Sequence, residues 1–424
     1  MSTPAISARF RNGDTDLTTI TACRVCGNGP LETVLDLGDL PLPSPLASAG
    51  RLEESDPAYP LELVRCGGCG LVQLRHEPPP SDPADEPTTG HSRSSGDDLH
   101  HARACVTEVI ALGLLGPRSL VIEVGSNDGL LLGCYAEHGI PVLGIERSRG
   151  PARAAERAGV ATLCTELTED LVQGLVAEDR QADVLHCNRL LGRFGDPHAL
   201  VSLLGRLLKK TGLLVVEVPY VKDLVDGIEI DTIRHDRRCL FSLATLMPLF
   251  QQHDLVVTEA KRLASDGGAL RLYCASHGRP GGSVDALLRL EQHSGLDDAA
   301  YYQGLAPRAA AVKQGLVRLL RDLRSQGRRI VAYGAGTRGC NLINFCGIGP
   351  DLVDYIVDLN SSKHGRFVPG ALLPICPTER LLEDQPDYCL LLAWDHAQEI
   401  SSQQSEYRRR GGHFVTPLPE PGFI

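Results

Sequence analysis

The sequence predicts an α/β protein in which a small N-terminal domain organised by cysteines precedes two Rossmann-like domains. Three observations predict this fold. Two CxxC pairs lie near the N-terminus, and two strand, glycine turn and helix units follow, one in the middle of the chain and one near its end. Because 424 residues exceed what one hydrophobic core usually serves, we expect separate domains over residues 1–90, 91–280 and 281–424.

Composition and charge narrow the class of protein. Hydrophobic residues make up 42% of the chain and charged residues 22%, which is typical of a folded globular protein. The net charge of −11 argues against a nucleic-acid partner, since phosphate backbones bind basic surfaces. No apolar run approaches the ~20 residues that cross a bilayer, and the N-terminus lacks the apolar core of a signal peptide. We therefore expect a cytoplasmic protein with no membrane partner.

Four of the cysteines have the spacing of a metal site. They are Cys23, Cys26, Cys66 and Cys69. The two-residue spacing lets both thiolates of a pair face one ion, and two pairs complete a tetrahedral zinc shell with no open position. The glycines beside them can take the positive φ angles of zinc-knuckle turns; they are Gly27, Gly67, Gly68 and Gly70. We predict a structural zinc ion; the alternatives are two unrelated reduced pairs or a redox-active dithiol.

The middle of the chain begins with a predicted helix from about residue 99 and a short apolar strand at 119–124. The strand runs directly into the glycine turn 125–129, and a helix at 130–139 follows. In this layout a nucleotide-like ligand lies against the turn. The next strand, 141–146, ends in an acid that can bind ribose hydroxyls.

The spacing in this turn favours S-adenosylmethionine (SAM) over a dinucleotide. Gly125 and Gly129 form Gly-x-x-x-Gly, with Glu123 ahead of them and Glu146 placed 21 residues after Gly125. A pyrophosphate needs the room that GxGxxG provides, whereas SAM has no pyrophosphate. A turn without a ligand is the alternative. The predicted cofactor-binding residues are Glu123, Gly125, Asn127, Gly129, Glu146 and Asn188.

Two further strands end at residues that could meet a ligand. A strand at 182–187 leads to Asn188, a helix is expected at 198–212, and a strand at 213–220 ends at Tyr220. Ligands of open α/β sheets bind at the C-terminal ends of the strands. The two end residues are therefore candidates for cofactor and substrate contacts.

The C-terminal part repeats the glycine-turn pattern. Long charged helices are expected over 283–327, and GxGxxG follows a strand, with its first glycine at Gly334. The next strand closes at Asp358, which taken alone indicates a dinucleotide such as NAD(P). We favour the other reading, in which the turn binds a different phosphate group, that of a nucleoside diphosphate, with a bidentate contact from Arg338.

Taken together, these motifs resemble the three-domain nucleotide-sugar C-methyltransferases of deoxysugar and antibiotic biosynthesis. The resemblance extends from Cys23 to the PLPEPGF tail. It rests on both CxxC pairs, LDLGDLPLPSPL, GLVQL, EVGSNDG, LGIERS, EVPY, DTIRHD, GGALR, YGAGTRG, VPGALLPI and LLLAW. It implies a zinc-binding N-terminal domain, a SAM-binding Rossmann-like middle domain and a Rossmann-like C-terminal domain. We expect a monomer or weak oligomer.

The resemblance also implies a substrate and a reaction. A nucleoside-diphosphate keto-sugar, with dTDP the expected nucleotide, is held between the domains. A carbon beside the ketone is deprotonated, and the enolate attacks the methyl group of SAM. This chemistry requires a base, usually histidine, and a donor aimed at the enolate oxygen. The expected substrate-binding residues are Tyr220, Arg234, Arg271, Tyr333, Gly334, Arg338 and Asn341.

The sequence differs from the family at the positions of the residues that usually carry out this reaction. The segment that usually reads DTIYHEH has Arg234 and Arg237 in place of the tyrosine and the second histidine. Arg193 stands where another histidine is expected, segment 90–95 lacks the usual tyrosines, and the usual HGGSLR is DGGALR at 266–271. Arginine stays protonated and cannot accept a proton from carbon. The usual base is therefore missing.

Two readings of the catalytic residues remain. In one, His235, oriented by Asp236, is the base, while Arg237 or Arg193 stabilises the enolate. In the other, the scaffold catalyses a different reaction. For His235 itself, the alternative to catalysis is a structural role in a loop. The nearby arginines suit an acceptor with an additional carboxylate or phosphate, or else form a solvated basic surface; they are Arg189, Arg193, Arg234, Arg237 and Arg238.

Three other functions stay open beside methyl transfer to a sugar nucleotide. The lost bases and the complete GxGxxG fit a reassigned enzyme that uses SAM or a nicotinamide for another reaction, such as ketoreduction. A non-catalytic accessory protein that binds SAM or a sugar nucleotide is the second. An RNA methyltransferase with a zinc ribbon is the third, which the acidic balance disfavours.

Overall fold

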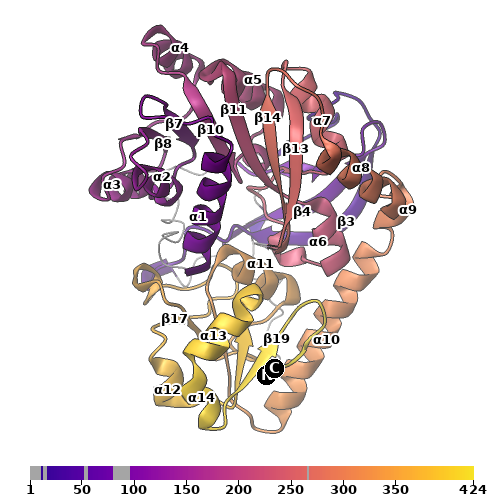
Figure 1. Cartoon of the computed structure of the whole chain (residues 1–424). Helices are drawn as coiled ribbons and strands as arrows, with labels where there is room; N and C mark the ends of the chain where they lie inside the picture. Colours follow the sequence, from indigo (N-terminus) through magenta and orange to yellow (C-terminus); the bar gives the residue numbers. More distant parts are fainter. Residues whose placement is uncertain (1–10, 13–16, 52–55, 80–95, 265–266) are drawn as a thin grey trace.

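The computed structural model of the chain describes residues 11–12, 17–51, 56–79, 96–264 and 267–424. Three large sheets organise these residues, and helices cover both faces of the second and third (Figure 1). The predicted α/β class is confirmed. Among the described residues, no helix is both long and apolar enough to cross a membrane.

The N-terminal unit, residues 11–79 where described, is built on strands. The long antiparallel hairpin of β3 and β4 is extended by β5 on the other side of β4. β12, which comes from the middle of the chain, pairs antiparallel with β5 and completes the sheet. The strands of this unit are β1 Arg11–Asn12, β2 Thr18–Thr19, β3 Leu31–Pro41, β4 Pro57–Cys66, β5 Val72–Leu74 and β6 His76–Glu77.

The middle unit, residues 96–275, contains a seven-stranded sheet in the order β13-β14-β11-β10-β7-β8-β9. The five strands from β11 to β9 are parallel, and β14 and β13 continue the sheet as antiparallel strands. The strands of this sheet are β7 Val121–Val124, β8 Val142–Ile145, β9 Thr162–Leu163, β10 Ala182–Asn188, β11 Leu208–Pro219, β13 Val256–Leu263 and β14 Ala269–Ala275. The unit also contains β12 Cys239–Leu240, which pairs with the N-terminal sheet.

Helices cover the two faces of the middle sheet because buried side chains alternate along its strands. In β7, Val121 belongs to the hydrophobic cluster formed with α1 and α2 on one face of the sheet. Its neighbour Ile122 belongs to the hydrophobic cluster formed with α4, α5 and α7 on the other face. The helices are α1 Gly96–Ala111, α2 Leu130–Ala136, α3 Arg149–Arg157, α4 Glu169–Ala177, α5 Pro197–Leu207, α6 Val221–Gly227 and α7 Leu243–Gln251.

The predicted helix at 198–212 extends too far. α5 ends at Leu207, and β11 begins at once, with Leu208 paired to Ala182 of β10. A Cβ on Gly212 would lie 2.9 Å from the Ala182 carbonyl oxygen, so glycine allows the two strands to approach there. Sheet pairing therefore ends the helix before residues 208–212.

The C-terminal unit, residues 282–424, has a six-stranded sheet in the order β17-β16-β15-β18-β19-β20, parallel except for β20. The predicted helices over 283–327 are confirmed as α8, α9 and α10. The strands are β15 Ile330–Tyr333, β16 Ile356–Val357, β17 Ile375–Cys376, β18 Tyr388–Leu391, β19 His413–Thr416 and β20 Gly422–Phe423. The helices are α8 Gly282–Ser294, α9 Ala299–Tyr302, α10 Leu305–Ser325, α11 Thr337–Cys346, α12 Arg380–Asp384, α13 Ala397–Gln403 and α14 Ser405–Arg409.

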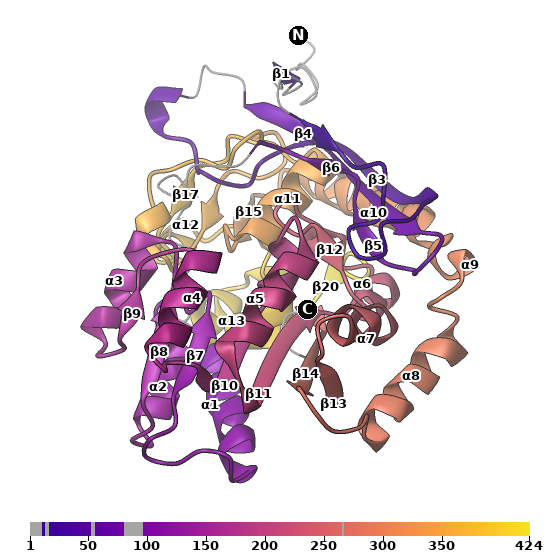
Figure 2. The same cartoon turned by 90° about the horizontal axis from the view of Figure 1, so that it is seen from above.

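The three units pack against one another around α11. In Figure 1, α11 lies at the junction of the middle unit above and the C-terminal unit below. Figure 2 shows the N-terminal strands along one side of the molecule, beside both other units, and α11 contacts β3. The predicted boundary at residue 90 lies outside the described residues, and the one at 280 lies between β14 and α8. The division at these residues stays a prediction.

Candidate functional site

The four cysteines of the CxxC pairs come together. Their sulfur atoms lie within 4.8 Å of one another, with Cys23 Sγ 3.6 Å from Cys69 Sγ and Cys26 Sγ 3.5 Å from Cys66 Sγ. A tetrahedral zinc ion with Zn–S distances of about 2.3 Å needs sulfur atoms about 3.8 Å apart. The thiolates therefore fit zinc, and the ion would hold the two turns together without an open coordination position.

The glycines beside these cysteines differ in conformation. Gly27 and Gly70 have φ angles of +69° and +79°, as predicted for knuckle turns. For Gly67 and Gly68 the prediction is wrong, since neither has a positive φ. A Cβ on Gly67 would lie 3.3 Å from the ring of Pro30, so glycine there provides space.

The turn after β7 has the strained conformation that its glycines allow. Gly125, Asn127 and Gly129 have φ angles of +76°, +50° and +74°. A Cβ on Gly129 would lie 3.0 Å from Ala155 Cβ, so glycine also lets α2 pack closely on α3.

Glu146, at the end of β8, lies against this turn. Its Oε2 accepts the Asn127 N–H at 3.0 Å, and its Oε1 accepts the Ser148 N–H at 2.7 Å. The carboxylate thus connects the end of one strand to the turn that follows the neighbouring strand. This is the position that the sequence predicts for a ribose-binding acid.

Several buried polar atoms at the turn and the adjacent strand ends have no hydrogen-bond partner among the described residues. They are Glu123 Oε2, Ser126 Oγ, Asn127 Oδ1 and Asn188 Oδ1. Burial, reinforced by the charge of Glu217, raises the pKa of Glu123 to about 8. An unpaired buried polar group costs about 1–3 kcal/mol. The cluster therefore fits a polar ligand, and SAM can supply the missing hydrogen-bond partners.

Residues 229–238, here called the bridging segment, connect the middle unit to the C-terminal unit. Arg234 Nη1 donates to Thr337 Oγ1 in the first turn of α11 at 2.7 Å. Asn341 Nδ2, one turn further along α11, donates to the Ile233 carbonyl at 2.7 Å. Two predicted substrate residues, Arg234 and Asn341, therefore lie at this junction.

The same segment also contacts the N-terminal unit. His235 Nε2 donates to the Tyr59 carbonyl of β4 at 3.0 Å, and burial lowers the pKa of His235. Arg238 Nε donates to Glu77 Oε2 at 2.8 Å. His235 is only 3% exposed, so the structure places it in the packing between two units.

Asp236 is held by arginines. Arg234 donates from Nε to Oδ1 at 2.9 Å and from Nη2 to Oδ2 at 3.1 Å, and Arg193 Nη2 lies 2.8 Å from Oδ2. Burial opposes ionisation, but Arg234, Arg193 and Arg237 outweigh it and hold the pKa of Asp236 well below its ordinary value. The backbone N–H of Arg237 donates to the Arg234 carbonyl at 2.9 Å. The predicted catalytic residues are thus brought together, apart from His235, which faces Tyr59.

Arg338 of α11 lies among acids. Its Nε donates to Asp231 Oδ2 at 2.8 Å and its Nη1 to Asp395 Oδ2 at 2.6 Å, and its guanidinium lies 5.1 Å from the ring centroid of Trp394. Glu229 Oε2 is 4.0 Å from Nη2, and burial raises the pKa of Glu229 to about 8. Carboxylates thus accept from Nε and Nη1, whereas the buried Nη2 has no hydrogen-bond partner among the described residues.

The glycine turn of the C-terminal unit precedes α11. Gly334 has a φ of +97°, and Asp358 at the end of β16 accepts the Ala335 N–H at 2.7 Å. Tyr333 and Asn341 each have a buried oxygen, Oη and Oδ1, without a hydrogen-bond partner among the described residues. These unpaired atoms flank the turn and α11.

Two predicted substrate residues lie at strand ends of the middle sheet. Tyr220 follows β11, and its N–H donates to the Gly268 carbonyl at 3.2 Å. Arg271 in β14 is 2% exposed and donates from Nε to Glu217 Oε1 at 2.6 Å and from Nη1 to Glu108 Oε2 at 2.9 Å. Arg271 therefore supports other side chains in this structure.

The network around Arg271 was not predicted from the sequence. His101 of α1 lies with Nε2 2.9 Å from Glu217 Oε2, and Tyr273 donates to Glu108 Oε2 at 2.8 Å. Burial raises the pKa of Glu217, but His101 and Arg271 outweigh it and hold it at about 2. His101 and Glu217 are 116 residues apart in sequence, so no local pattern indicates that they pair.

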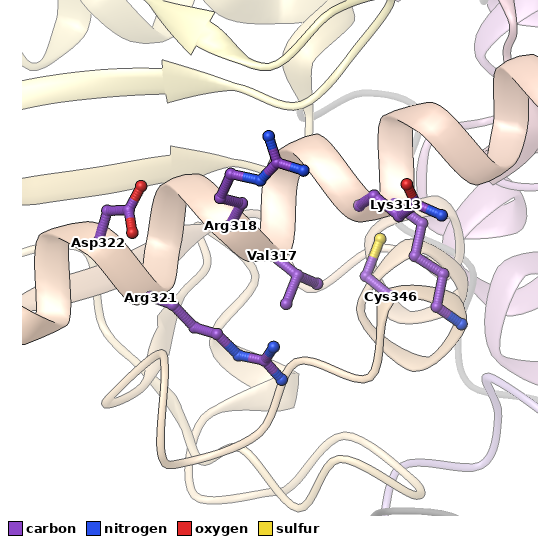
Figure 3. Close-up of a pocket in the computed structure, with 7 residues that line it drawn as sticks. Lys313, Val317, Arg318, Arg321, Asp322 and Cys346 are labelled. Carbon is purple, nitrogen blue, oxygen red and sulfur yellow. The ribbon is translucent and has the colours of Figure 1, made fainter.

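A hollow of about 540 Å³ lies elsewhere, beside α10 (Figure 3). Its lining residues are Lys313, Gln314, Val317, Arg318, Arg321, Asp322 and Cys346. None of these was a predicted site residue, and the hollow does not include the bridging segment. Of the segments in which the sequence departs from the family, 90–95 and Asp266 lie outside the described residues.

The sequence matches known families along most of its length. Residues 23–82, 99–260 and 264–419 match family models described as a zinc binding domain, a methyltransferase domain and a C-methyltransferase C-terminal domain. The magnesium protoporphyrin IX methyltransferase of Synechocystis, solved with bound SAM, is similar at 15% identity and a TM-score of 0.32, over 42% of this chain and 78% of that one. A SAM-dependent methyltransferase of Anabaena variabilis is similar at 14% identity and a TM-score of 0.33, over 41% and 84%.

One relative is similar along nearly its whole length. C-methyltransferase NovU of Streptomyces niveus is 30% identical over 414 residues, which are 96% of this chain and 97% of that protein. The chain belongs to the family of SAM-dependent C-methyltransferases that includes NovU.

Proposed function

We propose that the chain transfers the methyl group of SAM to a carbon of a nucleoside-diphosphate deoxy-keto-sugar, with dTDP as the nucleotide, in natural-product biosynthesis. The main support for this proposal is the position of the bridging segment. It connects the edge of the middle sheet, where SAM would bind, to the first turns of α11, where the nucleotide would bind. A sugar attached to that nucleotide would then lie beside the segment.

For SAM, the turn after β7 is the proposed site. Glu146 would bind the ribose hydroxyls, and the positive φ angles of Gly125 and Gly129 would shape the turn around the ligand. The unpaired atoms of Glu123, Asn127 and Asn188 would receive its polar groups. Bound SAM supplies an electrophilic methyl group, and the chain's own residues orient it.

For the nucleotide, the proposed contacts come from the C-terminal unit. Arg338 would bind the diphosphate bidentately, which requires Asp231 and Asp395 to give up their hydrogen bonds to it. The turn at Gly334 would approach the phosphates, and the unpaired oxygens of Tyr333 and Asn341 would accept hydrogen bonds from the nucleotide or its ordered water. Tyr220 and Arg234 would face the sugar, and Arg271 would act indirectly, through Glu217.

The enolate formed on the sugar needs positive charge near its oxygen. Arg193 and Arg234 share Asp236, so three side chains carry two positive charges and one negative charge, and Arg237 adds another positive charge. We assign enolate stabilisation to this group. For His235 we propose the structural role instead of the catalytic one, because its Nε2 is bound to Tyr59 and the ring is buried.

Two alternatives remain. Because the GxGxxG turn is complete, the chain could be an enzyme that uses a nicotinamide, and it could also be a non-catalytic accessory protein. Against NAD(P), Asp358, the acid that would bind the adenosine ribose, already forms an ion pair with Lys363 at 2.9 Å, whereas Glu146 in the middle unit has no such partner among its hydrogen bonds to described residues. We therefore favour a nucleoside diphosphate at this turn.

The experiment is methyl transfer from isotopically labelled SAM by the zinc-loaded protein to a panel of dTDP- and UDP-linked keto-sugars, with NAD(P)H titrated in parallel. We expect label in one class of keto-sugar and no NAD(P)H binding. Label in none of them from a folded, SAM-binding protein would refute the proposal. Saturable NAD(P)H binding lost in Gly336→Asp would instead support the reassigned enzyme.

A further inference from the structure

We propose that His101 is the proton acceptor of the methyl-transfer reaction and that Glu217 positions it. The inference rests on the proposed function, since it names the base for deprotonation of the sugar carbon. Neither residue was among the candidates drawn from the sequence.

The imidazole of His101 is fixed by a buried carboxylate. Its Nε2 lies 2.9 Å and 3.2 Å from the two oxygens of Glu217. Glu217 is held from the other side by Arg271 Nε at 2.6 Å, and both of these side chains are at most 4% exposed. A histidine oriented by a fixed, ionised carboxylate is the usual arrangement of a general base.

The pair lies at the proposed SAM edge of the sheet. Glu217 is close to the C-terminal end of β11 and is the register partner of Asn188 in β10. β10 in turn pairs with β7, which ends at the glycine turn. Glu123, Asn188 and Glu217 point to the same face of the sheet, because register partners in parallel strands share a face and residues two apart also share one. This face is the one that α1 covers, with His101 near the helix start.

The unpaired atoms beside the pair are the second observation. Glu123 Oε2 and Asn188 Oδ1 are buried without hydrogen-bond partners among the described residues, and both belong to this row of strand ends. The charge of Glu217 also contributes to the raised pKa of Glu123, which places the two carboxyl groups in one electrostatic neighbourhood. His101 therefore lies beside the space that we assign to SAM.

The ring has one nitrogen left for chemistry. The polar contacts of His101 to described residues all involve Nε2, which lies 2.9 Å and 3.2 Å from the Glu217 oxygens and 3.4 Å from Arg271 Nη2, a donor that cannot bond to a protonated Nε2. Because ionised Glu217 can only accept, Nε2 carries the proton in the neutral ring and Nδ1 carries the lone pair. The His101 side chain is 25% exposed, whereas the Glu217 side chain is buried, so of the two residues His101 is the one that a substrate could reach.

The other titratable groups of the site are less suited to accept a proton. His235 also has an unpaired Nδ1, but its ring is only 3% exposed in the packing between two units, and burial lowers its pKa. Asp236 is a weak base, because its pKa is held low by Arg234 and Arg193. Glu229 has a raised pKa, but its carboxyl lies against Gly267 and near Arg338, at the nucleotide side of the junction.

The proposed step balances without a further reactant. The C–H bond beside the ketone breaks, its proton goes to His101 Nδ1, and the electron pair moves into the enolate. The enolate carbon then forms a bond to the methyl carbon, the methyl–sulfur bond breaks, and its electron pair stays on sulfur as the neutral thioether. The imidazolium returns the proton to solvent.

The test uses solvent-deuterium exchange at the carbon beside the ketone, which needs the base but no methyl transfer. The zinc-loaded full chain is incubated in D₂O with dTDP-4-keto-6-deoxyglucose and the other keto-sugars of the panel, with S-adenosylhomocysteine present, and exchange is followed by NMR. His101→Gln is compared with His100→Gln, a matched control at the neighbouring, exposed position of α1. SAM affinity and melting temperature are measured for each protein.

We expect His101→Gln to slow exchange and methyl transfer at least ~100-fold with unchanged SAM affinity, and His100→Gln to match the wild type. Imidazole added to His101→Gly should restore part of the exchange, which a structural role would not allow. Glu217→Gln should lower kcat with little change in the KM for SAM. If the wild type exchanges and His101→Gln exchanges at the same rate, this assignment is wrong and the proposed function stands. If the wild type exchanges none of the keto-sugars, both are overturned.

Discussion

Arg238 of the bridging segment donates from Nε to Glu77 Oε2 of the N-terminal unit at 2.8 Å. The same carboxylate accepts from Arg24 Nε at 3.1 Å, and Arg24 directly follows the zinc-site residue Cys23. Burial opposes ionisation of Glu77, but the two arginines outweigh it and lower its pKa. A chain of three charged side chains thus connects the cysteine cluster to the segment that bears Arg234 and Asp236.

Removal of zinc should therefore reduce catalysis more than SAM binding. With Cys66→Ser or a chelator, the turn that bears Arg24 loses its anchor and β5 loses its fixed position beside β12. We expect methyl transfer to fall by about 100-fold, as for a misplaced catalytic group, with SAM affinity little changed. Hydrogen exchange should rise at 234–240. The control is Cys164→Ser, at an exposed thiol; a zinc-free protein with full activity would disprove this connection.

Glu123 should make stability depend on pH. Burial raises its pKa from 4.5 to about 8, so the folded chain keeps the proton that the unfolded chain releases between these values. The free energy of unfolding that protonated Glu123 contributes is therefore complete below pH 4.5 and is lost as pH rises toward 8. Glu123→Gln should be as stable as the wild type at pH 4.5 and increasingly more stable above it, by up to about 1.4 kcal/mol for each pKa unit.

Urea unfolding of the ligand-free protein at pH 5 and pH 8 measures this difference, since SAM would itself shift the equilibrium. Glu137→Gln, at a side chain that is 60% exposed, is the control and should change neither value by more than a few tenths of a kcal/mol. A stability gain for Glu123→Gln that is equal at both pH values would show that Glu123 is ionised in the folded chain.

Arg338→Gln should weaken binding of the sugar nucleotide. Loss of a charged, bidentate phosphate contact raises the KM for this substrate by about 10- to 100-fold, with the SAM affinity unchanged. Because the change removes the guanidinium from buried Asp231, which keeps the Trp394 Nε1–H as a donor, Arg338→Gln/Asp231→Asn separates loss of binding from loss of stability. Arg318→Gln, at the hollow beside α10 shown in Figure 3, is the control in the same unit. Equal KM values for the wild type and Arg338→Gln would exclude a phosphate contact.

The parts of the fold that sequence could predict are those with local causes. The CxxC spacing, the turn from Gly125 to Gly129 and the charged helices before β15 depend on residues close together in the chain, and each of them forms as expected. The end of α5 could not be predicted, because it depends on pairing of Leu208 with Ala182 of another strand.

In the candidate site, too, local sequence patterns predict some residues, and contacts between distant parts of the chain place the others. Glu146 and the glycine turn follow from the spacing of one βαβ unit. The placement of His235 depends on Tyr59, 176 residues away, and the pairing of His101 with Glu217 spans 116 residues. A histidine near the start of a helix has no distinguishing sequence pattern, so only the folded structure indicates a role for His101.

Calorimetric titration of the folded, zinc-loaded chain with SAM is the most direct test that the turn after β7 binds the methyl donor. We expect one saturable site per chain. Glu146→Gln should bind about 10- to 100-fold more weakly, because the carboxylate would accept hydrogen bonds from the ribose and from Asn127 and Ser148. Glu166→Gln, at a side chain that is 63% exposed, should bind as the wild type does. No measurable heat of binding from the wild-type chain with either SAM or S-adenosylhomocysteine would contradict the assignment of this turn.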